Sequence, residues 1–318
     1  MKCAFPLIFL VLTARAGPAL ALPGLTGAPV LNTPIGARSS GMGRAFTAVP
    51  GDPEALSYNP GALAFARRAS VSATYMNGLF DGNYGFLAAP VPLGRFVLTP
   101  ACLYFNSGVI DLKYSDPAKA PETVTAESDT VIYLSAGWRP APELGMGVTL
   151  KRVSLELAET VSATSLHYDL GILYAVKNGL SFGASYLNSG GNIKFERRGD
   201  PPPRTKKLGA SYKFKVNPHS LSDWNTDLTD LDMLLSADWT RTDGEKGYCQ
   251  GGAEANMLLD ALGGKIVFTV RLGYMAGRDS AGVAYGLGLA WKNWNFDYSL
   301  TPSSALEAVS QVTAGYKF

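Results

Sequence analysis

Apolar and polar residues alternate with a period of two over long stretches of this chain. In 166–177, Leu166 and Tyr168 begin a series of apolar even-numbered positions, while most odd-numbered positions are polar or small. The same alternation recurs over 231–239 and 294–300. Successive side chains of a β-strand point to opposite faces, so each segment is predicted to form a strand with one apolar and one polar face.

Two arrangements produce this pattern: a soluble sandwich with apolar faces inward, or a barrel whose apolar face meets lipid. Many segments run for about 9–12 residues, which matches a tilted membrane-crossing strand rather than a soluble strand of about 5–6 residues. Tyr, Trp and Phe gather at segment ends, as in the aromatic girdles of membrane barrels. The polar face mixes charged residues with Gly and Ser, which suits a lumen better than a protein core. The pattern therefore favours the membrane barrel.

Fourteen segments between residues 69 and 318 show this pattern. The expected strands are 70–76, 83–90, 95–105, 129–138, 143–153, 166–177, 179–187, 205–214, 230–241, 247–257, 264–275, 283–292, 294–300 and 308–318. An even number is typical of single-chain bacterial barrels and places both barrel ends on the periplasmic side. The expected fold class is all-β: a 14-stranded antiparallel transmembrane β-barrel.

The lengths of the connections test this strand count, because short periplasmic turns should alternate with longer extracellular loops. The clearest short turns are 139–142, 178 and 293, and the clearest long loops are 106–128, 154–165 and 188–204. The connection 215–229 breaks the rule, since it should be periplasmic and yet spans 15 residues. Its Asn217-Pro218 step is a turn signal, so we interpret it as an insertion rather than a missed strand pair.

The last predicted strand ends on an aromatic residue with apolar residues at alternate positions before it. Tyr316 and Phe318 share one face, and Lys317 lies on the other. This pattern is typical of the strand that the outer-membrane barrel assembly machinery captures. We therefore expect Tyr316 and Phe318 to form an assembly signal, with that machinery and outer-membrane lipid as partners.

The first 21 residues are predicted to be a signal peptide. Lys2 provides a basic start, 5–14 an apolar stretch, and Ala19-Leu20-Ala21 the small-x-small cleavage pattern. The apolar stretch is shorter than the roughly 20 residues of a spanning helix. Removing Lys2 and Arg15 takes the net charge from +2 to about zero, which gives no indication of a nucleic-acid partner. The expected location is the bacterial outer membrane.

Residues 22–68 lack the alternation and are predicted to form a plug inside the barrel. The first half is rich in small residues, and Gly41 and Gly43 would allow close approach to the barrel wall. Asp52-Pro53 is predicted to cap and begin a short helix. Asn59-Pro60-Gly61 follows, and the residue before proline is expected to end that helix.

At these residues the sequence resembles the PorV/PorQ-type outer-membrane proteins, within the FadL-like β-barrel superfamily. The likeness lies in 36–48, then Asp52 and the element Asn59-Pro60-Gly61-Ala62-Leu63. In that family the element usually reads Asn-Pro-Ala-Gly or Asn-Pro-Ala-Ala, so Gly61 departs from the pattern. The resemblance implies a 14-stranded barrel with an N-terminal plug, or hatch, over the whole mature chain.

The resemblance does not imply a single function. PorV-like members serve type IX secretion by holding exported proteins at the outer membrane, and FadL-like members admit hydrophobic molecules through a lateral opening. Our first expectation is the PorV-like role in protein export to the cell surface. The alternative is FadL-like uptake of hydrophobic small molecules, and a third is a structural barrel with neither role. Apolar lining near the plug, with a gap in the wall, would favour uptake, whereas a sealed lumen under large apolar loops would favour export.

No set of residues points to catalysis, so we expect a protein that is not an enzyme and uses no metal or cofactor. His167 is predicted to face the lumen with Asp169, near Ser162 and Ser165. Outer-membrane hydrolases use such pairs, but no third, orienting group is evident, so we favour a structural hydrogen bond. His219 is interpreted as a loop residue, and neither histidine has a metal-ligand spacing.

Charged residues of both signs recur on the predicted inward faces. The expected lumen network comprises Asp169, Lys177, Asp238, Glu254, Lys265 and Arg271. Mixed signs supply the partners that buried charges need, so we interpret the set as ion pairs that hold the plug rather than as a polar conduit. A plugged barrel of this size would leave little space for a diffusion pore, which usually takes about 16–18 strands.

Two predicted extracellular loops combine apolar and basic side chains. The residues are Val109, Ile110, Leu112 and Tyr114 in one loop, and Phe195, Arg197 and Arg198 in the other. Apolar residues mixed with arginine are typical of protein interfaces. The loops are therefore either a binding surface for exported proteins or ordinary loop structure.

Overall fold

A computed structural model of the protein describes most of the chain. The described residues are 26–33, 35–77, 82–114, 118–195, 199–217, 228–261, 264–277, 282–302 and 308–318. The predicted signal peptide, Arg197, Arg198, His219 and most of the 215–229 connection lie outside them. Within these residues, no helix is long and apolar enough to cross a membrane.

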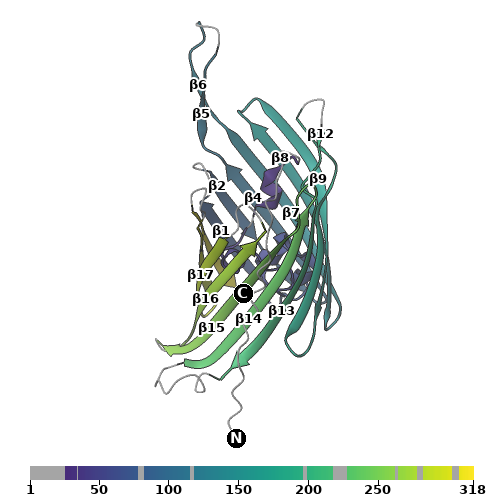
Figure 1. Ribbon diagram of the computed structural model, residues 1–318, viewed down its shortest axis with the longest axis vertical. Helices are drawn as coiled ribbons and strands as arrows, with labels where there is room; N and C mark the ends of the chain where they lie inside the picture. Colours follow the sequence, from purple (N-terminus) through teal and green to yellow (C-terminus); the bar gives the residue numbers. More distant parts are fainter. Residues whose placement is uncertain are drawn as a thin grey trace.

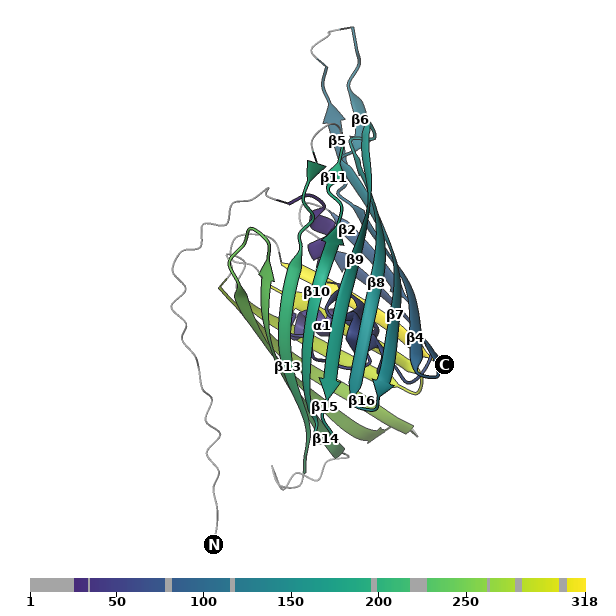
Figure 2. The same ribbon diagram turned by 90° about the vertical axis from the view of Figure 1, so that its right-hand side faces the viewer.

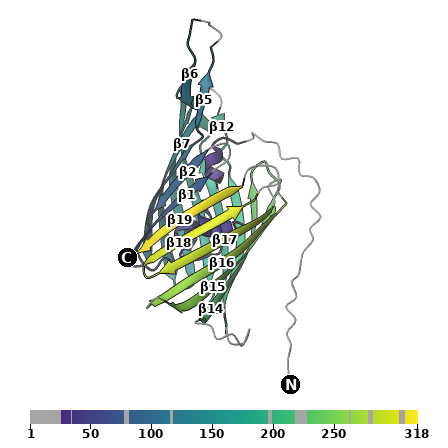
Figure 3. The ribbon, with the colours of Figure 1, turned by 90° about the vertical axis from the view of Figure 1, so that its left-hand side faces the viewer.

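All fourteen expected segments form strands of one closed antiparallel barrel, so the predicted fold class is confirmed. The barrel strands are Ser70–Asn77 (β1), Asn83–Ala88 (β2), Phe96–Asn106 (β4), Glu127–Ala141 (β7), Leu144–Leu157 (β8), Val161–Ala175 (β9), Leu180–Gly190 (β10), Thr205–Val216 (β13), Leu228–Thr242 (β14), Tyr248–Ala261 (β15), Gly264–Ala276 (β16), Gly282–Trp291 (β17), Trp294–Thr301 (β18) and Val309–Lys317 (β19). Each strand pairs with its neighbours (Figure 1), and β1 closes the barrel on β19 (Figure 3).

Two of the expected long loops are in fact largely strand. Strands β8 and β9 extend so far that only 158–160 connect them, where 154–165 was expected to be loop. Most of 106–128 forms a hairpin of Val109–Leu112 (β5) and Glu122–Thr125 (β6), which projects beyond the barrel (Figures 1 and 2). The prediction was wrong here because polar residues such as Thr and Ser continue the two-residue alternation above the apolar band.

Three further short strands complete the structure: Val91–Leu93 (β3), Ile193–Lys194 (β11) and Gly199–Asp200 (β12). The barrel end that carries the β5–β6 hairpin and the β11–β12 pair is called the long-loop end. The opposite end, where β7 meets β8 and β17 meets β18, is called the short-turn end. The long-loop end is the one expected to be extracellular.

Apolar side chains cover the outer face of the barrel. On β7, for example, Ile132 and Leu134 are about half exposed, whereas Val131 and Ser135 of the same strand are fully buried. The same alternation continues on the other strands, as on β17. An exposed apolar exterior with a packed interior is the arrangement that a lipid environment stabilises.

The plug fills the lumen with four short helices rather than the one expected. They are Pro29–Asn32 (η1), Ala37–Gly41 (α1), Pro53–Ser57 (η2) and Pro60–Leu63 (α2), and α1 lies inside the barrel in Figure 2. Asp52 caps η2 by accepting a hydrogen bond from the Glu54 amide at 2.8 Å, as predicted. Asn59 differs from its expected role: it begins α2 by accepting from the Gly61 amide instead of only ending the preceding turn.

Candidate functional site: the lumen and its plug

The plug docks where the barrel wall has no side chains. Cross-strand pairing places Gly137, Gly147 and Gly171 in one row over β7, β8 and β9. Helix α2 lies against this row so closely that a methyl group on Gly171 would overlap the side chain of Asn59. Asn59 also donates hydrogen bonds to Thr47 within the plug (2.8 Å) and to the Ile172 carbonyl of β9 (2.9 Å). The α2 motif is therefore fixed by shape and by hydrogen bonds together.

Two glycines of the plug, Gly41 and Gly43, meet the opposite wall, over β17 and β16. A Cβ atom on Gly41 would lie 2.9 Å from the Cα of Gly286 on β17. Gly43 has a left-handed φ of 62°, and its Cβ would lie 2.6 Å from the Tyr274 amide of β16. Both positions thus require glycine, one for space and one for conformation as well.

Glu254 of β15 joins the plug to the wall. Its two carboxylate oxygens accept hydrogen bonds from Arg38 of α1 at 2.8 and 2.7 Å, in a two-pronged pair. Arg271 of β16 donates to the same carboxylate at 2.7 Å and also pairs with Asp297 of β18 at 2.7 Å. Arg38 pairs in turn with Asp52 of the plug at 2.7 Å. Charges of both signs are thus buried as one connected network, as buried charges require.

Asp238 of β14 provides a second anchor. One of its oxygens accepts hydrogen bonds from the amides of Phe46 and Thr47, at 2.9 and 2.8 Å, and from the Thr47 hydroxyl at 2.6 Å. A carboxylate that accepts several charge-assisted bonds holds its partners firmly. Asp238 and Glu254, both expected in the lumen network, therefore bind the middle of the plug.

A third polar cluster surrounds Asp169 on β9. Asp169 pairs with Lys151 of β8 at 2.7 Å and accepts the amide of Asn188 at 2.7 Å. His167 lies on the same inward face, with its Nε2 atom 2.8 Å from the Ser165 hydroxyl. Asp169 is engaged by Lys151 and Asn188, and the His167 Nδ1 atom has no hydrogen-bond partner among the described residues. Ser165, His167 and Asp169 thus do not form a nucleophile, base and orienting acid in series.

Lys177 and Lys265 lie outside the buried network in which they were expected. The Lys177 side chain is 89% exposed in the β9–β10 turn, 3.7 Å from Glu143. Lys265 is exposed at the short-turn end of β16. Strand β9 ends at Ala175, so the inward alternation does not reach residue 177.

The inner wall over β2, β4, β7 and β8 is apolar towards the long-loop end. Cross-strand pairing forms one row of buried inward-facing residues: Phe86, Leu103, Val131 and Val153. Leu155 and Ala163 extend this surface over β8 and β9. The surface is hereafter called the apolar wall. The inward residues of β13–β19 are instead mostly polar, so the lumen has two chemically different halves.

The first part of the plug covers the apolar wall. Val30 and Leu31 of η1 and the nearby Ile35 are buried in the same hydrophobic cluster as Leu103 and Val131. Phe195, expected in a partner-binding loop, also packs against this cluster and is only partly exposed. The first part of the plug and the loop residue Phe195 therefore shield the apolar wall from water.

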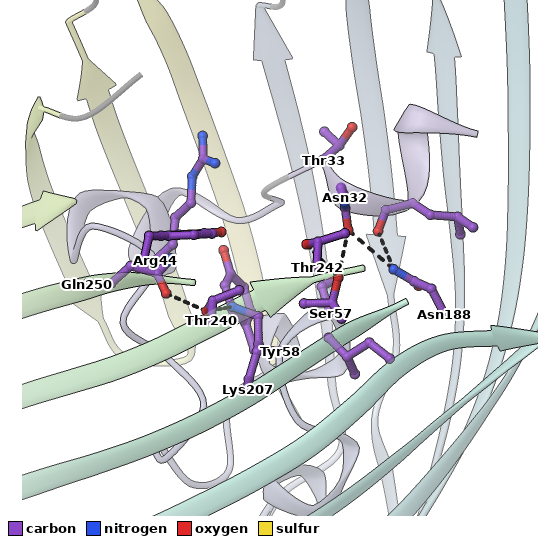
Figure 4. A pocket seen from close by; sticks show the side chains of 14 residues that line it. Asn32, Thr33, Arg44, Ser57, Tyr58, Asn188, Lys207, Thr240, Thr242 and Gln250 are labelled. Carbon is purple, nitrogen blue, oxygen red and sulfur yellow. Dashed lines mark hydrogen bonds between the residues drawn. The ribbon is translucent and has the colours of Figure 1, made fainter. Parts of the chain in front are cut away.

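A small polar cavity separates the plug from the opposite wall (Figure 4). Its volume is about 40 Å³. The lining residues are Leu31, Asn32, Thr33, Arg44, Ser57, Tyr58, Leu187, Asn188, Thr205, Lys207, Thr240, Thr242, Tyr248 and Gln250. Hydroxyl, amide and basic groups dominate this lining, and it contains no carboxylate side chain. The cavity is thus complementary to oxygen-bearing or anionic groups.

The barrel wall is irregular beside this cavity. The ladder between β10 and β9 shifts register between Tyr186 and Ser189, and Asn188 has a φ of 60°. The ladder from β10 to β13 ends at the Leu187–Thr205 pair. Beyond it lies the segment 201–203, three prolines that have no amide hydrogen to donate. We call this region the β10–β13 seam.

Hydrogen bonds from Asn188 and from the backbone of the plug close the seam. The Asn188 amide group donates to the carbonyls of Leu31 (3.3 Å) and Pro203 (3.2 Å), and Lys151 donates to its oxygen at 2.6 Å. The Gly27 amide donates to the Pro201 carbonyl at 2.9 Å. The bonds to Leu31 and from Gly27 involve the plug, so the plug contributes to the integrity of the wall.

The predicted partner-binding residues of the first loop lie on the projecting β5–β6 hairpin. Val109 is 70% exposed, Ile110 44% and Tyr114 40%. Leu112 is half-buried on the same hairpin. Tyr316 and Phe318 lie on the outer face of β19 at the short-turn end, with their rings 5.1 Å apart.

Several residues of this site were not singled out from the sequence. Arg38 was part of a small-residue block, and Asn188 and the wall glycines were given no role of their own. The role of Asn188 depends on a bulge, which strand alternation does not predict. Among the described residues, no cluster of three or more His, Cys, Asp or Glu side chains could hold a metal ion.

Comparisons with known proteins give a likeness at the level of fold. No family model matches the sequence, and no curated protein matches it. The solved structure of the CymD monoaromatic hydrocarbon channel matches with 12% identity and a TM-score of 0.52, over 89% of this chain and 97% of that one. The Pseudomonas putida toluene transporter TodX matches with 11% identity and a TM-score of 0.53, over 89% and 98%. The chain therefore has the fold of these barrels, which indicates an outer-membrane location.

Proposed function

We propose that this protein admits hydrophobic small molecules across the outer membrane, as a member of the FadL-like superfamily. The apolar wall is the observation that carries this proposal, because a polar conduit would not need a continuous row of Phe, Leu and Val inside its lumen. Burial of an apolar ligand against such a surface is favourable in proportion to the area removed from water. The similar structures are described as channels or transporters for toluene or monoaromatic hydrocarbons, which supports the same class of cargo.

The plug must rearrange during transport. An apolar cavity of about 150 Å³ holds one benzene molecule, whereas the cavity in this lumen measures about 40 Å³ and is polar. Displacement of η1 would uncover the apolar wall and remove the Leu31 contact of Asn188. The cargo could then reach the β10–β13 seam, where the wall lacks a continuous hydrogen-bond ladder. We propose this seam as the lateral exit.

A disulfide lock tests the proposal. A Cβ atom on Gly27 would lie 3.3 Å from the Cβ of Asp200, close to the spacing of about 3.5–4.5 Å found in disulfides. The variant Gly27→Cys/Asp200→Cys would pin the start of the plug to the long-loop end. Cys102 and Cys249, the native cysteines of the described residues, are free and would be replaced by Ser in all variants compared.

Uptake of radiolabelled toluene by cells producing the protein is the measurement. We expect uptake above that of cells lacking it, loss of the increase in the oxidised double-cysteine variant, and recovery after reduction. The single variant Gly27→Cys is the matched control. If the unlocked protein adds nothing to uptake of toluene or of a long-chain fatty acid, the proposed function is wrong. If uptake occurs and the lock leaves it unchanged, only the plug movement is wrong.

A role in type IX export, similar to that of PorV-like proteins, is the second candidate. The observation that favours it is the β5–β6 hairpin, which carries exposed Val109, Ile110 and Tyr114 far beyond the barrel (Figure 3). Exposed apolar residues on a projecting element suit contact with another protein. Quantitative comparison of periplasmic and surface proteins with and without the gene tests it. If the protein acts in export, a set of proteins should accumulate in the periplasm when the gene is absent.

A further inference from the structure

The rim at the short-turn end carries a continuous series of basic side chains. Five are exposed: Arg67, Arg68, Arg95, Lys292 and Lys317. They occupy the link from the plug to β1, the β3–β4 turn, the β17–β18 turn and the end of β19. We call these five residues the basic rim sector.

Backbone hydrogen bonds show that these positions are neighbours. The Lys317 amide donates to the Asn293 carbonyl, and the Phe318 amide donates to the Ala69 carbonyl, both at 2.9 Å. Ser70, two residues after the arginine pair, donates to the Pro90 carbonyl at 3.1 Å. The basic residues thus follow one arc of the rim, over β18, β19, β1, β2 and β4.

Charge pairing distinguishes this arc from the β13–β14 arc of the rim. No described carboxylate forms an ion pair with any of the five residues, and Lys292 lies over the ring of Trp291 at 4.6 Å. On the β13–β14 arc, in contrast, Lys213 lies 3.1 Å from Asp232, and Lys215 lies 3.6 Å from Asp230. The positive charge of the basic rim sector is therefore available to an external anion.

Exposed aromatic rings lie directly beside the basic residues on the outer face. They are Phe96, Trp138, Trp291, Trp294, Phe296 and Phe318, and each is 42–71% exposed. Rings of Trp, Tyr and Phe mark the level of the lipid headgroups in membrane barrels. The basic rim sector thus lies at the headgroup level of one leaflet, where a soluble partner would have to compete with lipid.

We propose that the basic rim sector binds the phosphate groups of anionic phospholipids, such as phosphatidylglycerol, in the leaflet at the short-turn end. Arginine donates in a planar fork that matches phosphate oxygens, and two of the arginines are adjacent in the chain. One basic side chain near an anionic membrane surface contributes about fivefold in affinity. The sector therefore selects phosphatidylglycerol over a zwitterionic lipid of the same chain length.

Tryptophan fluorescence tests this selection, because Trp138, Trp291 and Trp294 lie in the arc itself. The protein, with Trp224 and Trp239 replaced by Phe, would be reconstituted in nanodiscs that contain brominated phosphatidylglycerol or brominated phosphatidylcholine as the quencher. We expect the anionic lipid to quench at about fivefold lower mole fraction. Raising the salt concentration to about 0.5 M should reduce the difference, because exposed charges are then screened.

Charge-removal variants locate the site. Arg67→Gln/Arg68→Gln should reduce the difference between the two lipids severalfold, with folding verified by circular dichroism. Lys213→Gln/Lys215→Gln removes the same charge from the paired arc and should leave the difference unchanged. Equal quenching by both lipids in the unmodified protein would overturn the proposal. An equal loss in both pairs of variants would also overturn it, because net charge alone would then explain the selection.

Discussion

Arg38 of the plug and Glu254 of the barrel wall form a two-pronged ion pair, with N–O distances of 2.8 and 2.7 Å. The Glu254 side chain is 2% exposed, and it also accepts from Arg271. The contact therefore joins α1 to the adjacent strands β15 and β16, at a sequence separation of 216 residues between Arg38 and Glu254. A neutral residue at position 254 would leave the guanidinium groups of Arg38 and Arg271 without the carboxylate that they share.

Glu254→Gln should lower the free energy of unfolding by about 1.5–3 kcal/mol, because Arg38 and Arg271 lose the carboxylate that they share while each keeps its pair with Asp52 or Asp297. Urea unfolding of the reconstituted barrel, followed by tryptophan fluorescence, measures this change. Asp232→Asn is the control, since Asp232 pairs with the largely exposed Lys213 and should cost less than about 1 kcal/mol. Equal costs for the two variants would contradict the role given to Glu254.

Gly171→Ala should disrupt the docking of α2. The added methyl group would overlap the Asn59 side chain and approach the Gly61 amide within 2.8 Å, so we expect a destabilisation of about 1–3 kcal/mol. Gly85→Ala in β2 is the matched control, because no atom lies within 4 Å of its added Cβ. Limited proteolysis should cleave the plug faster in Gly171→Ala only. Resistance equal to that of the unmodified protein would show that α2 does not need this close contact.

Titration of Glu54 should make stability depend on pH. Burial, together with the charges of Asp52 and Asp297, raises the pKa of Glu54 from 4.5 to about 8. The folded state then binds more protons than the unfolded state between these two values, so stability falls as pH rises from about 4.5 to about 8. The slope should not exceed about 1.4 kcal/mol per pH unit, the value for one proton.

Glu54→Gln should flatten this dependence, because the amide cannot ionise while its oxygen can still accept from the Ser39 amide, as Glu54 does at 2.8 Å. Urea unfolding at several pH values between about 5 and about 8 makes the comparison. If the two proteins show the same slope, another group is responsible.

Val131→Thr should reduce uptake by placing a hydroxyl group on the apolar wall at nearly constant volume. Val131 is fully buried, and an unpaired hydroxyl in such a place costs about 1–3 kcal/mol. Uptake of toluene should therefore decrease severalfold. Val148→Thr, on the lipid-facing side of β8 and 39% exposed, should leave uptake unchanged. Similar uptake by both variants would exclude the apolar wall from the transport route.

The sequence predicted the barrel because period-two alternation depends only on neighbouring residues. All fourteen strands followed from it, and so did the inward positions of Asp169, Asp238 and Glu254. The partners of these carboxylates could not be predicted, because Arg38 reaches Glu254 only once 216 residues of chain have closed into a barrel. The division of the lumen into apolar and polar halves was also missed. It becomes visible only when strand register places Phe86, Leu103 and Val131 in one row.

The bulge at Asn188 illustrates a second limit. The loop 188–204 was expected to begin at this residue, but β10 continues through it to Gly190. In its left-handed conformation the Asn188 side chain contacts Leu31, Lys151 and Pro203. Lys177 shows the opposite error, since the alternation was extended two residues beyond the end of β9. Local patterns thus predict where a strand runs but not how it ends or bends.

The apolar and polar halves of the lumen place different constraints on substitution. The carboxylates that anchor the plug, Asp238 and Glu254, lie on one half, and residues that would contact cargo, such as Leu103 and Val153, lie on the other. A substitution on the apolar wall can therefore reshape cargo preference while these carboxylate anchors stay in place. A barrel of this design can diversify in what it carries while the charged anchors of its plug are inherited unchanged.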